Sequence, residues 1–238
     1  MENRSLSERL STPQMVLPLA HSDKASFDNY WVGDNYELVA ALRSIVQIGD
    51  PKLLYFYGPA SAGKSHLLFA AMRLAKQDNV NTGYLSLSDK HVNVDMLEMA
   101  TNQSLVFIDN IDAWAGDEEN ERALFTLFEQ IKHAGGQLVI TSAQPPESSG
   151  FVIVDLVSRL LSGLIYGLYE LSEEQQLDAI KMRANQRGLS ISDDTVKYLL
   201  KRSSRDNREL FKILELIDQA SLVEQRRITI PFIQSLFK

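Results

Sequence analysis

The segment Gly58-Pro-Ala-Ser-Ala-Gly63-Lys64-Ser65 has the residue types and spacing of a phosphate-binding loop. It matches G-x-x-x-x-G-K-S at every fixed position, and it follows an apolar run and precedes an amphipathic stretch. Its glycines let backbone N–H groups converge on phosphate oxygens, Lys64 can reach the β- and γ-phosphates, and the Ser65 hydroxyl can bind Mg²⁺. An ordinary glycine-rich turn is the alternative. The predicted nucleotide contacts here are Gly58, Pro59, Ala60, Ser61, Ala62, Gly63, Lys64, Ser65 and His66.

Asp109 is the second candidate, because it follows four apolar residues in Leu105-Val-Phe-Ile108-Asp109. At the carboxyl end of a buried strand, its carboxylate can hold the metal that bridges nucleotide phosphates. Many buried strands end in Asp, so the pattern carries weight only together with the phosphate loop. Asn110 follows, and an amide can hydrogen-bond a water but is a poor base. Asp112 lies two residues further on. The site is therefore predicted to bind nucleotide better than it hydrolyses it.

Such residues need a scaffold that brings the ends of several strands together. Up to residue 170, short apolar runs alternate with amphipathic stretches, which predicts an α/β fold with a parallel five-stranded sheet between helices. The expected strands are 53–57, 83–87, 105–108, 138–141 and 164–168, and the expected helices are 36–48, 64–77, 93–100, 118–134 and 153–161.

After residue 170 the pattern becomes helical. Ser172-Glu-Glu-Gln175 forms a capping box, and a helix of about 15 residues follows it and ends at Gly188. Further helices are expected at 193–202, 207–223 and 230–237, and Asp206 and Glu209 could cap the one at 207–223. The chain is thus divided into an N-terminal segment (1–23), a nucleotide-binding core (24–170) and a small all-α domain (171–238).

Composition narrows the classes of protein. The chain has 238 residues, of which 45% are hydrophobic and 23% charged, so it is globular rather than disordered. Its net charge of −7 argues against a protein that binds nucleic acid over its whole surface. The absence of cysteine excludes disulfides and thiolate sites, and four scattered histidines predict no zinc site. The acidic stretch Asp117–Glu121 is expected to be a solvated helix start.

No apolar run is long enough for a membrane-spanning helix, and the N-terminus has no secretory signal. A cytoplasmic protein without membrane contacts is therefore expected. Residues up to 170 carry a net charge of −9 and the remainder +2. This division favours contact with DNA through a partner rather than through the chain itself.

Together, the phosphate loop, the strand that ends in Asp109 and the helical C-terminal region resemble the AAA+ ATPases, and among them the relatives of the bacterial replication initiator DnaA. The likeness covers residues 24–238 and implies an AAA+ core followed by a helical lid. Four further motifs are similar to the segment beside the adenine, sensor 1, box VII and sensor 2. They are Phe27-Asp-Asn-Tyr30-Trp-Val-Gly33-Asp-Asn35, Leu138-Val-Ile-Thr141-Ser142-Ala143-Gln-Pro-Pro146, Asp155-Leu-Val-Ser158-Arg159-Leu160 and Asn207-Arg208-Glu209-Leu210.

Departures from DnaA narrow the resemblance. DnaA has a DNA-binding helix-turn-helix domain after its lid, whereas this sequence stops at Lys238, and it also lacks DnaA's N-terminal helicase-loading domain. The chain therefore resembles the short DnaA homologues of the Hda subfamily, which inactivate the initiator after replication starts. Ala143 stands where DnaA-like sensor 1 segments usually carry Asp, which further disfavours intrinsic hydrolysis.

The resemblance implies a bound ADP or ATP, with ADP favoured, and Mg²⁺ on Ser65 and Asp109. Tyr30, Trp31 and Val32 would lie beside the base, although core packing of these residues and Phe27 is an equal contender. Arg208 would contact the phosphates from the lid. The alternative is a solvated arginine in a stretch that also contains Arg202 and Arg205.

Arg159 is implied to act on another molecule. By resemblance it would be an arginine finger that reaches ATP held by DnaA, and such fingers contribute about 10³–10⁵ in rate. The alternative is a surface arginine paired with Asp155, four residues earlier.

The hexapeptide Gln14-Met15-Val16-Leu17-Pro18-Leu19 resembles a sliding-clamp-binding peptide. Gln14 can hydrogen-bond at the mouth of a pocket, Met15, Leu17 and Leu19 supply apolar anchors, and Pro18 reduces the conformational freedom that binding must remove. An edge strand or a segment docked on the core is the alternative.

These features predict a regulator of chromosomal replication initiation. It would bind the DNA-loaded sliding clamp, meet DNA through that clamp, and stimulate ATP hydrolysis by DnaA to prevent re-initiation. The alternatives are a self-sufficient ATPase that remodels or loads another protein, and a non-catalytic DnaA-family adaptor. AAA+ proteins assemble head-to-tail, so a homodimer or a head-to-tail oligomer remains open.

Overall fold

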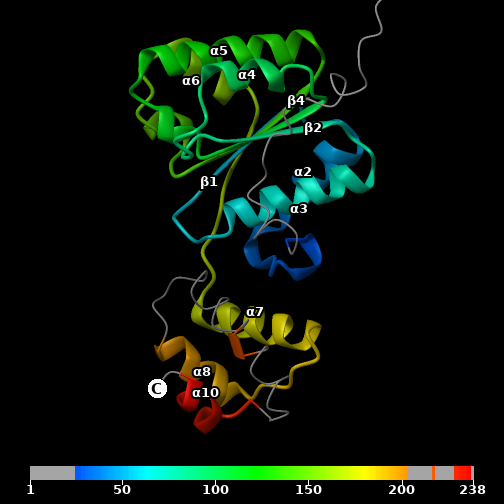
Figure 1. Ribbon diagram of the computed structural model, residues 1–238, viewed down its shortest axis with the longest axis vertical. Coiled ribbons are helices and arrows are strands. Elements are labelled where there is room, and N and C mark those ends of the chain that lie inside the picture. Colours follow the sequence, from blue (N-terminus) through cyan, green and yellow to red (C-terminus); the bar gives the residue numbers. More distant parts are fainter. Residues whose placement is uncertain (1–24, 203–215, 218–227, 237–238) are drawn as a thin grey trace, which may run out of the picture.

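The computed structural model of the chain describes residues 25–202, 216–217 and 228–236 and has a β-sheet between layers of helices (Figure 1). The strands are β1 (Leu53–Tyr57), β2 (Thr82–Ser86), β3 (Leu105–Asp109), β4 (Gln137–Ser142) and β5 (Leu164–Gly167). They are all parallel and lie in the order β2-β3-β4-β1-β5. Because β4 lies between β1 and β3, its carboxyl end separates the loop after β1 from Asp109.

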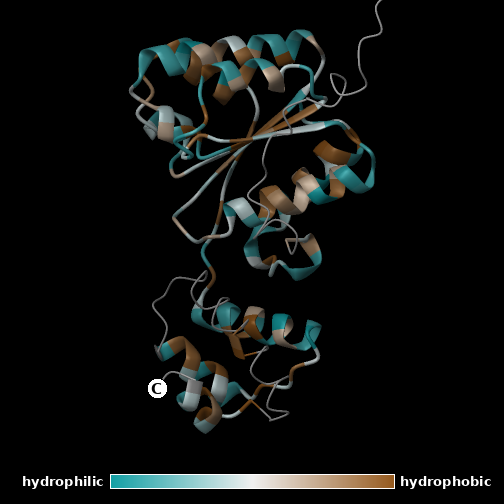
Figure 2. Ribbon diagram, viewed as in Figure 1, coloured by the Kyte–Doolittle hydropathy of each residue, from teal (hydrophilic) through white to brown (hydrophobic). Residues whose placement is uncertain are grey.

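Two groups of helices cover the two faces of the sheet. On one face lie α2 (Tyr36–Gln47) and α3 (Lys64–Gln77), and on the other lie α4 (Val94–Ala100), α5 (Glu118–His133) and α6 (Val154–Leu161) (Figure 1). These helices bury apolar residues against the sheet, and the alternation of hydrophobic and hydrophilic residues along them gives their mixed colours in Figure 2. This amphipathic pattern is the one that the sequence contained.

The strands explain why the sheet has two separate cores. In β1, Leu54 and Phe56 belong to the cluster under α2 and α3, whereas Leu53 and Tyr55 belong to the cluster under α4–α6. Successive side chains of a strand point to opposite faces, so a strand covered on both faces reads as a continuous apolar run. The expected α/β sandwich is therefore confirmed, with strand and helix ends within a residue or two of their predicted positions.

The second region is helical, as expected. Its described parts include α7 (Glu173–Gln186), α8 (Asp193–Arg202) and α10 (Ile230–Leu236), which share an apolar cluster that includes Ile180, Val196 and Phe232. The capping box is formed, because Ser172 Oγ accepts from the Gln175 amide at 3.2 Å and Gln175 Oε1 accepts from the Ser172 amide at 3.0 Å. After α7, Gly188 has a φ of 73°, which suits glycine.

Shorter 3₁₀ turns connect these elements. They are η2 (Phe27–Asn29), η3 (Gly33–Asn35), η4 (Ile111–Trp114) and η5 (Pro146–Ser148). None of the helices within the described residues is both long and apolar enough to cross a membrane. The predicted clamp-binding peptide 14–19, Arg208, and all of the predicted helix 207–223 except residues 216–217 lie outside the described residues.

Candidate functional site

The loop 58–63 connects β1 to α3. The two glycines of the phosphate-loop pattern, Gly58 and Gly63, are each favoured for a different structural reason. A Cβ on Gly58 would lie 3.0 Å from Leu168 Cβ, so a larger residue there would have to displace the residue that follows β5. Gly63 has a φ of 102°, and a Cβ there would lie 3.1 Å from a ring carbon of Tyr30. Only glycine tolerates both constraints without strain. The loop therefore approaches its neighbours with bare backbone, as phosphate binding requires.

Lys64 begins α3 and its side chain lies across the loop. Its Nζ donates to the carbonyl oxygens of Gly58 at 2.5 Å and Pro59 at 2.9 Å. A flexible ammonium group with three donors can exchange such carbonyl partners for phosphate oxygens. The side chain is thus held at the loop to which the sequence assigned it.

Asp109 lies at the end of β3 among hydroxyl groups and is only 3% exposed. Ser65 Oγ donates to its Oδ2 at 2.7 Å, Tyr84 donates to the same oxygen at 3.4 Å, and Thr141 Oγ1 donates to Oδ1. Burial, with the negative charge of Asp109 beside it, raises the pKa of Tyr84 well above its usual value. The structure thereby brings the two predicted metal-binding residues, Ser65 and Asp109, into direct contact.

This donor set fits Mg²⁺. The ion takes oxygen ligands and commonly uses one or two carboxylates together with phosphates and water. Within the described part of the chain there is no cluster of three or more His, Asp or Glu residues of the kind that an all-protein metal site needs. Ser65 and Asp109 would therefore hold Mg²⁺ together with a nucleotide rather than alone.

The residues after Asp109 are engaged in structural contacts. Asn110 has a φ of 58°, its amide N–H donates to Thr141 Oγ1 at 2.9 Å and its side-chain Nδ2 donates to Ser88 Oγ at 3.2 Å. Asp112 accepts from the Ala143 amide at 3.2 Å through Oδ1. The Asp112 carboxylate thus fixes the exit of β4. Asn110 places an amide, which is a poor base, directly after Asp109.

The aromatic residues of the 26–35 segment divide between two roles. Phe27 is buried in the core, with the Arg43 guanidinium 4.5 Å from its ring centroid. Tyr30 instead lies over Gly63 and stacks on His66, with ring centroids 5.7 Å apart. Trp31 Nε1 is buried and has no hydrogen-bond partner within the described residues. Core packing therefore accounts for Phe27, and Tyr30 and Val32 also pack against that core. Tyr30 in addition lies beside the candidate phosphate site.

His66 joins this site to the lid. Its Nε2 hydrogen-bonds the Ser26 carbonyl oxygen at 3.1 Å, and Arg183 Nη2 donates to its Nδ1 at 3.3 Å. Burial and the charge of Arg183 lower the pKa of His66 to about 4. Sequence reasoning did not identify Arg183. Its contact with His66 depends on how α7 packs on the core, which local sequence patterns do not specify.

Arg159 lies on α6, on the opposite side of the sheet from α3. Its Nε forms an ion pair with Glu129 Oε1 of α5 at 2.8 Å, and its side chain is 39% exposed. The alternative pairing with Asp155 is therefore wrong, because packing of α6 on α5 supplies a different carboxylate. Arg159 is presented at the surface and held from the neighbouring helix.

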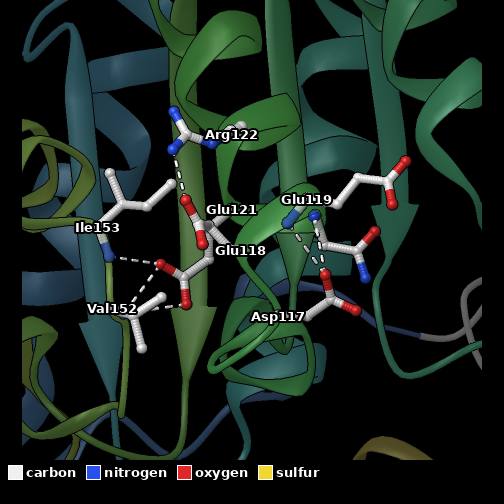
Figure 3. A network of polar contacts seen from close by, with 8 residues as sticks. Asp117, Glu118, Glu119, Glu121, Arg122, Val152 and Ile153 are labelled. Carbon is white, nitrogen blue, oxygen red and sulfur yellow. Dashed lines mark hydrogen bonds and ion pairs between the residues drawn. The ribbon is translucent and has the colours of Figure 1, made fainter.

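A contact between α5 and the residues just before α6 explains how α6 is placed (Figure 3). Glu121 is fully buried, and its carboxylate accepts from the amides of Gly116 at 2.8 Å, Val152 at 2.9 and 3.0 Å and Ile153 at 2.8 Å. Residues 152–153 lead directly into α6. Glu121 thus anchors the start of the helix that carries Arg159.

Glu121 also corrects an expectation. The acidic stretch was expected to be a solvated helix start, and Asp117 does cap α5 by accepting from the amides of Glu119 at 3.1 Å and Asn120 at 3.2 Å. Glu118 is also exposed and pairs with Arg122. Glu121, however, turns inward on the fourth residue of the helix. Helical periodicity placed it near the apolar positions Leu124 and Phe128, and that was the only sequence indication.

Comparisons with known proteins agree with this arrangement. A family model for the bacterial DnaA ATPase domain matches residues 22–170, and a model for the Hda lid domain matches residues 173–237. Domain III of the Thermotoga maritima replication initiation protein DnaA is 18% identical, with a TM-score of 0.73 over 88% of this chain and 93% of that chain.

Two further solved structures have the same fold. AMPPCP-bound DnaA from Aquifex aeolicus is 23% identical, with a TM-score of 0.71 over 86% of this chain and 66% of that one. The Thermotoga maritima RuvB Holliday junction branch migration motor is 21% identical, with a TM-score of 0.66 over 90% and 71% of the two chains. At these identities the structural likeness establishes the fold.

Proposed function

Because this chain belongs to the family of bacterial DnaA ATPase domains, we propose that it is a nucleotide-binding regulator of chromosomal replication initiation. It binds ADP or ATP with Mg²⁺ and stimulates ATP hydrolysis by DnaA. The division into a core at 24–170 and a lid at 171–238 is part of this proposal, and the ranges of the two family matches support it.

Nucleotide binding is the first part of the proposal. The loop amides and Lys64 hold the phosphates, Ser65 and Asp109 hold Mg²⁺, and Tyr30 and His66 lie beside the phosphate loop. Bound Mg²⁺ neutralises phosphate charge. The contact between Ser65 and Asp109 supports this assignment, as does AMPPCP bound to a DnaA of the same fold. Arg208 of the lid is proposed as a further phosphate contact, together with Trp31 and Val32 near the base.

Slow hydrolysis by the chain itself is the second part. Asn110 cannot act as a base, and the Asp112 carboxylate already binds the Ala143 amide. Ala143 carries no polar side chain toward the site. The bound nucleotide therefore serves to fix the shape of core and lid, and ADP suffices for that purpose.

The surface position of Arg159 carries the third part. It lies across the sheet from the chain's own α3, is partly exposed, and is steadied by Glu129 while Glu121 anchors the start of its helix. An arginine placed in this way can enter the nucleotide site of a neighbouring molecule. We assign it to ATP held by DnaA, where a guanidinium stabilises charge in the transition state of phosphoryl transfer.

Residues 14–19 supply the fourth part, a tether to the DNA-loaded sliding clamp. Linking two weak contacts raises the effective concentration of the second, so neither needs to be strong. DNA is then approached through the clamp, and conversion of DnaA to its ADP form prevents re-initiation. Head-to-tail contact with DnaA is the assembly that this proposal requires.

Turnover of radiolabelled ATP by DnaA, with and without this protein and DNA-loaded clamp, tests the proposal. We expect hydrolysis by DnaA to rise only when both are present, and the protein alone to turn over slowly. Fast turnover by the protein alone would favour a self-sufficient ATPase instead. Deleting Gln14–Leu19 should abolish clamp binding while leaving nucleotide binding intact, and retained clamp binding would refute the tether.

A further inference from the structure

The lid helix α7 is attached to the 26–35 segment by three polar side chains. Spacings of eight and three residues place them on one side of the helix. The pairs are Gln175 Nε2 with Asp34 Oδ2 at 3.4 Å, Arg183 Nε with the Asn29 carbonyl oxygen at 3.1 Å, and Gln186 Nε2 with the Asp28 carbonyl oxygen at 2.7 Å. One face of the lid therefore rests on the segment that precedes α2.

Arg183 reaches beyond this segment to the phosphate-loop helix. Its Nη2 donates to His66 Nδ1 at 3.3 Å, and a guanidinium can only donate. Nδ1 must therefore be unprotonated, and His66 Nε2 carries the proton that it donates to the Ser26 carbonyl oxygen. These two contacts hold the His66 ring in one orientation, with Nδ1 toward Arg183 and Nε2 toward Ser26.

The His66 ring leads directly to the loop. It follows Lys64 and Ser65 in the chain and stacks on Tyr30 at an interplanar angle of 30°. Tyr30 in turn lies 3.1 Å from the place where a Cβ of Gly63 would be. Arg183 is thus linked to the phosphate loop through two stacked aromatic rings, those of His66 and Tyr30.

The chain segment that connects the core to the lid is also held close to Tyr30. Asn35 Oδ1 accepts from the Tyr169 amide at 2.8 Å, and its Nδ2 donates to the Tyr169 carbonyl oxygen at 3.2 Å and to Tyr30 Oη at 3.4 Å. Tyr30 therefore touches the loop, the His66 ring and the residue that holds the linker. A shift of the loop has a direct route to both attachments of the lid.

We propose that Arg183 is a positioning residue that couples the orientation of the lid to occupancy of the phosphate loop. This inference rests on the proposed binding of nucleotide at that loop. Phosphates that order Gly63 and Lys64 fix Tyr30 and His66, and these two rings fix the guanidinium of Arg183. The lid then takes one position when nucleotide is bound and loses that constraint when it is not.

The distance between core and lid can be followed by fluorescence energy transfer, because the chain contains no cysteine of its own. Lys132→Cys on α5 and Lys197→Cys on α8 are exposed labelling positions. The test variant is Arg183→Ala. The matched control is Lys181→Ala on the same helix, whose bond to Asp193 at 2.6 Å stays within the lid. The probes are Mg·ADP and, lacking phosphates, adenosine.

We expect Mg·ADP, but not adenosine, to change the energy transfer in the labelled protein and in Lys181→Ala. In Arg183→Ala the change at saturating Mg·ADP should be lost, with affinity for ADP about 10-fold weaker. Arg183→Lys should behave like Arg183→Ala, because an ammonium cannot bond the Asn29 carbonyl and the His66 ring as a planar fork does. Arg183→Lys also serves if the alanine variant folds poorly.

An unaltered change at saturation in Arg183→Ala or Arg183→Lys overturns the proposal, and so does an unchanged distance in the parent protein that has bound ADP. A purely structural role would lower thermal stability without removing the ligand-induced change. If the parent protein fails to bind Mg·ADP at all, the proposed function itself is wrong and the coupling falls with it.

Discussion

Two buried carboxylates are held in different ways. One lies at the candidate phosphate and metal site, and the other lies beside the helix that carries Arg159. Asp109 at the end of β3 accepts from side-chain hydroxyls, whereas Glu121 at the start of α5 accepts from backbone amides. The hydroxyls belong to Ser65, Tyr84 and Thr141, and the amides to Gly116, Val152 and Ile153.

The difference indicates what each carboxylate can do. A hydroxyl can rotate and can also accept or bind a cation, so the Asp109 cluster can be rearranged around Mg²⁺. A backbone amide has one fixed donor, and its geometry belongs to the fold. Asp109 is therefore suited to ligand binding, and Glu121 to fixing the helix that presents Arg159.

The strongest test of this contrast is Glu121→Ala. Removing the acceptor of three amides should lower the free energy of unfolding by about 2–4 kcal/mol, because hydrogen bonds to a charged group are among the stronger ones and their donors would be left unpaired. Urea unfolding measures the change. Exposed Glu118→Ala on the same helix is the control and should change stability by about 0.5 kcal/mol or less. Equal effects of the two variants would remove the contrast.

Asp109→Asn should act mainly on ligand binding. We expect affinity for ADP in the presence of Mg²⁺ to fall at least about 10-fold, since a metal ligand is lost, with little change in the absence of Mg²⁺. Titration calorimetry with and without the metal measures both. Asp112→Asn keeps an oxygen that can accept from the Ala143 amide and should bind like the parent protein. A Mg²⁺-independent loss in Asp109→Asn would contradict the assignment.

Thr141→Val probes the hydroxyl cluster itself. The Thr141 hydroxyl donates to Asp109 and accepts from the Asn110 amide, so its removal should cost about 1 kcal/mol of unfolding free energy. Thr126→Val, which removes an exposed hydroxyl bonded to the Arg122 carbonyl oxygen, is the comparison and should cost less. Thermal unfolding of the two variants measures the difference. A larger loss of stability in Thr126→Val than in Thr141→Val would contradict the stabilising role of the hydroxyl cluster around Asp109.

Arg159→Ala should have the smallest effect on stability. Its ion pair with Glu129 is partly exposed, and such pairs contribute about 0.5 kcal/mol after solvent screening. A loss of several kcal/mol in urea unfolding would mean that Arg159 is a structural residue rather than one available to a partner.

The local features of the core could be predicted from sequence because each depends on nearby residues. Gly63, Lys64 and Ser65 lie between a continuous apolar run and an amphipathic stretch, and Ser172 with Gln175 forms a capping box. These patterns specify a turn, a helix start and a strand without reference to the rest of the chain.

Contacts between distant elements could not be predicted in the same way. The partner of Arg159 was sought within its own helix, at Asp155, whereas packing of α6 on α5 supplies Glu129. In the sequence, Glu121 is one of several acidic residues expected at the surface. In the structure it is buried, because residues 152–153 before α6 pack over it. Arg183 and His66 are 117 residues apart in the sequence, and only the packing of α7 on the core brings them together.

The most direct measurement is the rate of ATP hydrolysis by DnaA with DNA-loaded clamp and either the parent protein, Arg159→Ala or Arg122→Ala. Arg122 is an exposed arginine paired with Glu118 on α5 and serves as the matched control. We expect Arg122→Ala to stimulate hydrolysis like the parent protein. Arg159→Ala should lose about 10³-fold or all of the stimulation while still binding nucleotide and clamp. Undiminished stimulation by Arg159→Ala would contradict it and leave an adaptor that acts by binding alone.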